Sequence, residues 1–114
     1  MTSHPLVHHA LLRCNRQDSK AAPLFQPVKH LENVWIMELG TKKPLPWPEW
    51  LDHATTLLKK HKRKLASLSK TGSDCALHVV VDLTEPFHSA AFPPAFCVLS
   101  ASCGLTLEVV NSNL

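Results

Sequence analysis

Histidine is the residue of this sequence that could do chemistry most directly, because its side chain titrates near neutral pH and binds metals. The chain has eight histidines and four cysteines. A zinc site needs several such ligands that converge from short spacings. Here His8 and His9 are adjacent, so on a strand they point to opposite faces. Cys97 and Cys103 lie on a short predicted helix at a spacing that does not favour a shared metal. We therefore predict no metal site and no cofactor.

Ionisable side chains also recur at the same alternation position of three predicted strands: Glu38, His78, Asp82 and Glu108. If these strands are neighbours, the four side chains share one sheet face with the apolar residues Ile36, Val80 and Val110. A histidine and a carboxylate such as His78 and Asp82 could bind a ligand or transfer protons. A half-apolar face of this kind also fits a protein interface, or an ordinary solvated sheet face with incidental charges.

Five of the twelve cations lie within one hexapeptide, at Lys59, Lys60, Lys62, Arg63 and Lys64. Clustered cations attract polyanions such as nucleic acid. No aromatic residue is interleaved with them for base stacking, and cations near a helix C-terminus are favoured by the helix dipole. Without these five, seven Lys and Arg remain against nine Asp and Glu. The pattern therefore favours a solvated helix surface over a nucleic-acid site.

Signatures of enzymes are absent from the sequence. It contains no Gly-x-Ser-x-Gly, no glycine-rich phosphate loop and no Cys-x-x-Cys. The sequence thus supplies no catalytic residues, and the balance leans towards a protein that is not an enzyme.

The elements that must position these residues follow from hydrophobic periodicity. Apolar residues at helical spacing predict a long helix over 48–70, with Pro48 at its first position and His61 within the apolar stripe. Alternating apolar residues predict strands over 6–14, 34–39, 75–83 and 105–110. A shorter helix is predicted from Pro93 to Gly104. Residues 15–33 are predicted to be a long connection with a short extended piece near Leu24 and Phe25, and residues 41–47 a proline-rich turn.

These elements predict one domain over residues 1–114. The fold class is α+β, a two-layer sandwich with a mainly antiparallel sheet of about four strands and both helices on one face, of ferredoxin-like kind. Trp35, Trp47 and Trp50 are expected to pack one end of the core. The alternative for Trp47 is an exposed anchor for a partner.

Composition places the chain among folded proteins, because 45% of its residues are hydrophobic and only 18% are charged. No stretch reaches the roughly 20 apolar residues of a membrane span. Residues 1–10 lack a basic start followed by an apolar block, so no secretory signal is expected. We predict a cytoplasmic protein with reduced cysteines and no membrane association.

Several spaced residues carry a resemblance to a known family: Asn33-Val34-Trp35, the run from Trp50-Leu51 to Leu57-Leu58, then Leu65, Leu68 and Gly72, the strand Cys75 to Leu83, and Phe96, Leu99, Gly104 and Leu105 to Val109. Over residues 33–110 this pattern resembles the bacterial domain-of-unknown-function family 4279. The chain departs from the family in having Val110 and Asn111, with no acidic residue, at the end of the last strand. The resemblance implies the same α+β sandwich and a bacterial source, but no activity and no catalytic residues.

The function that the sequence favours is a small non-enzymatic bacterial module that binds a protein partner or a second copy of itself. One alternative is a small-ligand enzyme or sensor that uses His78 and Asp82 on the open sheet face. A second alternative is weak nucleic-acid binding through residues 59–64.

Overall fold

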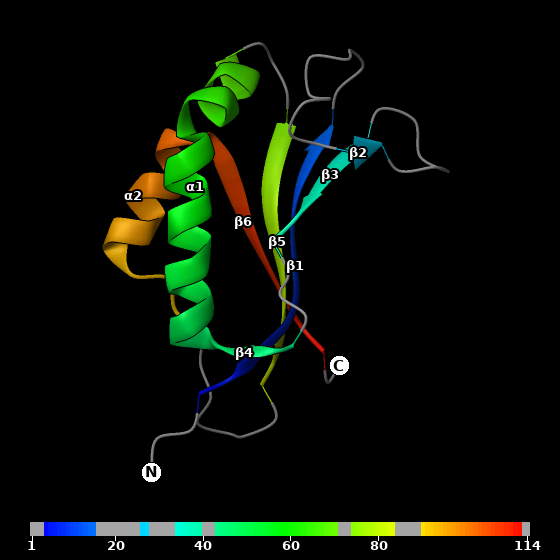
Figure 1. The fold of residues 1–114 in the computed structure, drawn as a ribbon, viewed down its shortest axis with the longest axis vertical. Coiled ribbons are helices and arrows are strands. Elements are labelled where there is room, and N and C mark those ends of the chain that lie inside the picture. Colours follow the sequence, from blue (N-terminus) through cyan, green and yellow to red (C-terminus); the bar gives the residue numbers. More distant parts are fainter. Residues whose placement is uncertain are drawn as a thin grey trace.

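The computed structural model of the chain describes residues 4–15, 26–27, 34–39, 43–70, 74–83 and 90–112. In these residues the elements are β1 (Leu6–Asn15), β2 (Gln26–Pro27), β3 (Val34–Glu38), β4 (Leu45–Pro46), α1 (Trp47–Lys70), β5 (Asp74–Asp82), α2 (Pro94–Ser102) and β6 (Leu105–Asn111). Both helices lie against one side of the sheet (Figure 1). The predicted α+β two-layer sandwich is confirmed.

The sheet has the order β2-β3-β1-β5-β6, and β4 pairs with β1 beside this path. Strand β1 runs antiparallel to β3, β4 and β5, whereas β5 and β6 are parallel. The sheet is therefore mixed but mainly antiparallel. The unit β5–α2–β6 places its two parallel strands side by side, whereas the unit β3–α1–β5 is split by β1. In a ferredoxin-like sheet another strand lies between the two parallel strands of each β–α–β unit. The protein therefore has the same two layers as that fold but connects its strands differently.

The core lies between the sheet and α1. The buried residues of α1 recur at helical spacing: Trp47, Trp50, Ala54, Leu58, Leu65 and Leu68. His61 is half-buried in the gap of this stripe, as the sequence predicted. The facing side chains of the two central strands are buried as well: Val7, Ala10, Leu12 and Cys14 of β1, and Cys75, Leu77, Val79 and Val81 of β5. Each fully buried Leu or Val side chain contributes about 1.5–3 kcal/mol to folding.

Strand β1 contains a β-bulge at His8. Val7 is the register partner of Val81 and His9 that of Val80, so His8 is an extra residue without a counterpart on β5. A bulge lets the side-chain alternation restart, which keeps both Val7 and Ala10 on the core face. This explains why the alternation in residues 6–14 looks weak in the sequence.

Four aromatic rings close the end of the core where α1 begins. Trp47 stacks on Trp50 with ring centroids 5.3 Å apart, Phe92 stacks on Phe96 at 5.3 Å, and Trp47 meets Phe92 edge to face. The indole Nε1 of Trp47 donates a hydrogen bond to the carbonyl of Ala91 at 3.0 Å. Trp47 is 5% exposed, so it is a core residue and not an exposed anchor. The side chain of Trp35 lies outside the described residues.

Within the predicted turn over 41–47, the structure describes residues 43–47, and residues 45–47 differ from the prediction. Leu45 and Pro46 pair with Val7 and Leu6 as strand β4, and the amide of Trp47 donates to the carbonyl of Pro5 at 2.9 Å. A proline is tolerated here because β4 pairs only with β1 among the described strands, so the missing N–H of Pro46 costs no ladder bond on a second side. The helix begins one residue earlier than predicted.

The predicted connection over 15–33 is described only at Asn15 and at Gln26–Pro27. Asn15 ends β1, and Gln26–Pro27 forms β2 against β3. The extended piece expected near Leu24 and Phe25, the helix stop at Gly72 and most of the expected loop over 84–92 lie outside the described residues. Neither described helix is long and apolar enough to cross a membrane.

Gly104 provides the first testable prediction. It has a φ of 71°, and a Cβ at this position would meet the side chain of Ser69 on α1. Gly104→Ala should therefore lower the free energy of unfolding by about 1–3 kcal/mol in urea denaturation. In a Gly104→Ala/Ser69→Gly double variant, the loss of stability caused by the steric overlap should be relieved. The loss caused by the positive φ should remain. An unchanged stability of Gly104→Ala would contradict this account of the turn.

Candidate functional site: the open face of the sheet

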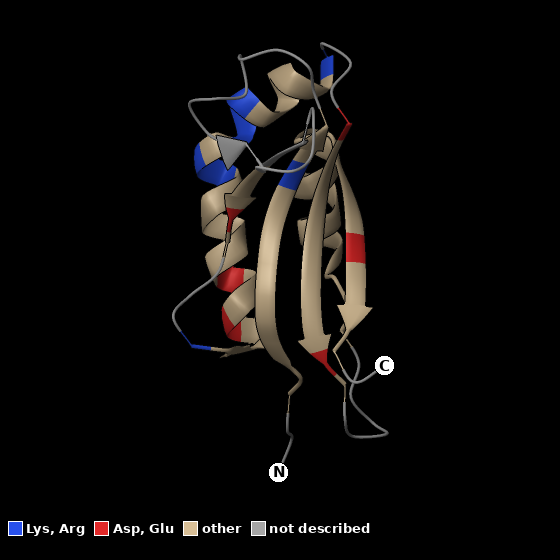
Figure 2. Ribbon diagram, turned by 90° about the vertical axis from the view of Figure 1, so that its right-hand side faces the viewer, with Lys and Arg blue, Asp and Glu red and all other residues tan. Residues whose placement is uncertain are grey.

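We call the side of the sheet that neither described helix covers the open face (Figure 2). The register places Leu11 of β1 opposite both Glu38 of β3 and His78 of β5, and places His78 opposite Glu108 of β6. Register partners share a face, so these side chains form one row across four strands. Asp82 lies on the same face at the end of β5, four residues from His78. The structure thus places the four candidates from the sequence on one face.

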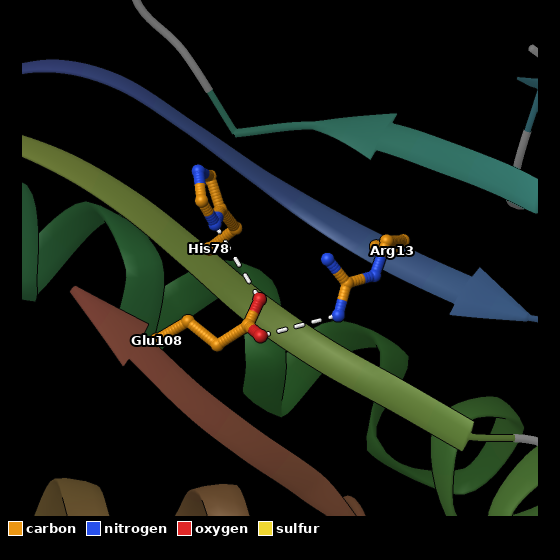
Figure 3. A network of polar contacts seen from close by, with 3 residues as sticks. All are labelled: Arg13, His78 and Glu108. Carbon is orange, nitrogen blue, oxygen red and sulfur yellow. Dashed lines mark hydrogen bonds and ion pairs between the residues drawn. The ribbon is translucent and has the colours of Figure 1, made fainter. Parts of the chain in front are cut away.

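Glu108 is the centre of a polar network on this face (Figure 3). One carboxylate oxygen, Oε2, accepts a hydrogen bond from Nη2 of Arg13 at 3.2 Å, and the other, Oε1, lies 3.4 Å from Nδ1 of His78. The three side chains come from β1, β5 and β6, which are consecutive in the sheet. The network therefore connects β5 to both of its neighbours, β1 and β6, through side-chain contacts.

Arg13 is the member of this network that the sequence reasoning missed. The sequence does contain a pattern that could have placed Arg13, because Arg13 lies two residues from Leu11 in the strand over 6–14 and so shares its face. The bulge at His8 hid the alternation, and so no face was assigned to it. The Nε atom of Arg13 is buried and has no hydrogen-bond partner in the described residues.

Partial exposure limits the energy of this network. The side chains of Arg13, Glu108 and His78 are 35%, 36% and 29% exposed. An ion pair with this much access to water, such as Arg13–Glu108, contributes about 0.2–1 kcal/mol. The network thus fixes side-chain positions more than it stabilises the fold.

His78 and Asp82 do not form an acid–base pair. Four residues along one strand separate their Cα atoms by roughly 13 Å. His78 instead contacts Glu108, while Oδ2 of Asp82 lies 3.6 Å from Nε2 of His8. Glu38 lies two strands from His78 and is exposed. The four candidates therefore share a face without converging on one point.

Apolar side chains fill the rest of the open face. Leu11, Ile36 and Val80 are half-buried, and Val110 is 43% exposed. Ala76 is opposite Arg13 and is only 3% exposed, so its methyl group is covered by longer neighbours. The open face is therefore half apolar, with charged groups that largely pair with one another.

The basic hexapeptide lies on the other layer, on α1 (Figure 2). Lys59, Lys60, Lys62, Arg63 and Lys64 are all exposed, and residues 59–64 line a surface hollow of ≈ 530 Å³. Burial lowers the pKa of His61 in their midst, and the charges of Lys60 and Lys64 lower it further. The cations are therefore available to solvent and are separate from the open face.

The cysteines and histidines of the described segments do not build a metal centre. Cys14, Cys75 and Cys103 are buried and Cys97 is exposed, and none of the four forms a disulfide. Burial raises the pKa of Cys103, which keeps this thiol protonated, although Lys62 opposes the effect. Within the described ranges no three His, Cys, Asp or Glu side chains lie close enough to hold an ion.

Comparison with protein-family models, with curated proteins and with solved structures found no match to this chain. The resemblance to the domain-of-unknown-function family 4279 therefore stays a prediction.

The pair of Arg13 and Glu108 gives a testable prediction for the network. A double-mutant cycle with Arg13→Met and Glu108→Gln should give a coupling energy of about 0.2–1 kcal/mol, because both side chains are partly in water. The coupling should fall as salt is raised. It is measured by urea denaturation of the four proteins. A coupling that is absent at low salt would show that the ion pair does not form in solution.

The lowered pKa of His61 leads to a prediction of how the stability of the fold depends on pH. Its pKa in the folded chain lies below the ordinary value of 6.5, so between these two pKa values the unfolded chain binds more protons. The free energy of unfolding should therefore fall as the pH drops below about 6.5. His61→Gln should remove this part of the fall. If the pH profiles of His61→Gln and the wild type coincide between pH 7 and the acid limit, the assignment is wrong.

Proposed function

We propose that this chain is a non-enzymatic binding module whose open face contacts a protein partner or a second copy of the chain. The observation that carries the proposal is the half-apolar open face, which no described helix or strand covers. Leu11, Ile36, Val80 and Val110 supply apolar area there. Faces of this composition are commonly buried against partners.

The charges of the open face suit an interface. Burying an unpaired charge is costly, whereas the carboxylate of Glu108 already has the Arg13 guanidinium as its ion-pair partner and contacts His78 within the chain. A partner can therefore cover them at lower cost. Glu38 lies on β3 and Asp82 at the end of β5, and both add acidic character to the face. A partner with an apolar centre and basic groups at its rim would complement this pattern.

The same proposal places the protein in the bacterial cytoplasm, on the strength of the family resemblance and of the reduced cysteines. The ligand or sensor alternative draws support from the contact between His78 and Glu108, but it lacks the convergence that an acid–base site needs. The nucleic-acid alternative draws support from the exposed cations of residues 59–64. Neither alternative has an observation as extensive as the open face.

Site-specific photo-crosslinking in cells that produce the protein tests the proposal. A crosslinking residue replaces Glu38, which is exposed on the open face, or Val98, which is 67% exposed on α2. Position 38 should give a discrete protein adduct and position 98 should not. The adduct mass then distinguishes a second copy from another protein. No adduct at position 38, or equal labelling at both positions, would contradict the proposal.

A further inference from the structure

Strand β6 (Leu105–Asn111) is the last strand of the sheet. It pairs with β5 on one side, and no described strand lies on its other side. Figure 2 shows β6 at the margin of the sheet, with its side away from β5 uncovered by the described helices and strands. We call this side the outer edge of β6.

The backbone of the outer edge can be assigned from one hydrogen bond. The amide of Ser112 donates to the carbonyl of Val81 on β5 at 2.8 Å. Successive residues of a strand direct their N–H and C=O groups alternately to the two sides. In β6 the even-numbered residues therefore face β5. The N–H and C=O groups of Leu107 and Val109 face outward, where they can pair with another strand.

The outer edge lacks the usual protection of exposed edges. Natural edge strands are blocked by lysine, proline, a bulge or very short length. Strand β6 has seven residues, contains no Lys, Arg or Pro, and keeps an unbroken register with β5. Its Val109 and Val110 are 40% and 43% exposed. The described strand at the opposite end of the sheet, β2, has only two residues.

The charge of β6 fits a second copy of the same strand. Glu108 is its one ionisable residue, and Arg13 and His78 of the same chain hold its carboxylate. In an antiparallel pair with a two-fold axis at Val109, Val109 faces its own counterpart and Glu108 faces Val110 of the second copy. The two carboxylates then do not lie directly opposite each other, which avoids like-charge repulsion. A two-fold axis also gives a closed dimer in which both outer edges are used.

We propose that two copies of this chain pair antiparallel along the outer edges of β6, with the two-fold axis at Val109, so that their sheets become one. This inference deepens the proposed function by naming a second copy as one partner, yet it uses the edge and leaves the open face free. The joined sheets present one continuous open face of twice the extent. Since the strand contact is short, the dimer depends on protein concentration.

Amide hydrogen exchange tests the geometry of the pairing in the full chain. On going from low to high protein concentration, the amides of Leu107 and Val109 should become protected. The amides of Glu108 and Val110 should show little change, because they already bond to β5. Light scattering on the same samples should show a rise in mass towards the dimer. Equal protection of odd and even positions, or no rise in mass, would overturn the inference.

A matched pair of variants locates the contact. Val109→Lys places two cations at the two-fold axis and should abolish the dimer, whereas Val98→Lys on α2 should leave it intact. Circular dichroism of both variants checks that they fold. A dimer that survives Val109→Lys would overturn the edge pairing. If these tests overturn the edge pairing while a crosslinking residue at position 38 still gives its adduct, the proposed function stands without the edge pairing. If position 38 fails while the dimer is lost only in Val109→Lys, the edge is the binding surface and the open face is not.

Discussion

The structure depends on one constraint: β1 must pair on both sides and still present apolar side chains to the helices along its length. The bulge at His8 meets this constraint, because it keeps Val7 and Ala10 on the core face although they are three residues apart. It also turns His9, Leu11 and Arg13 to the other face. The buried stripe of α1 and the network around Glu108 both rely on this one extra residue.

Local pattern was enough to predict most of the fold. The apolar stripe from Trp50 to Leu68 predicted α1, and the alternation of Leu77, Val79 and Val81 with His78 and Asp82 predicted β5. Strand β4 was missed because its pairing depends on β1, far away in the sequence, and prolines ordinarily signal a turn. The partner of His78 could not be predicted either. It depends on the parallel register that sets His78 against Glu108, which only the assembled sheet provides.

Glu108 connects the two surfaces proposed for binding. On the open face its carboxylate joins Arg13 to His78, and along the outer edge of β6 it is the only residue that could repel a second copy. The same contacts of Glu108 therefore make the face easier to cover and the edge easier to pair. In the sequence Glu108 is a candidate for a ligand or interface contact, and in the structure its carboxylate is paired with Arg13 of the same chain.

The pairing of β1 with β5 also bears on how the chain folds. Residues 6–15 find their partners at 74–82, across α1 and more than half of the sequence. The chain must close a large loop before this long-range pairing can stabilise it, and the entropy cost of closing the loop slows folding. During synthesis β1 emerges well before β5, while α1 can form locally in between. Although β3 and β4 emerge early enough to pair with β1, the side of β1 that pairs with β5 stays open until residues 74–82 have emerged, a state in which chaperone contact would matter more than for the finished protein.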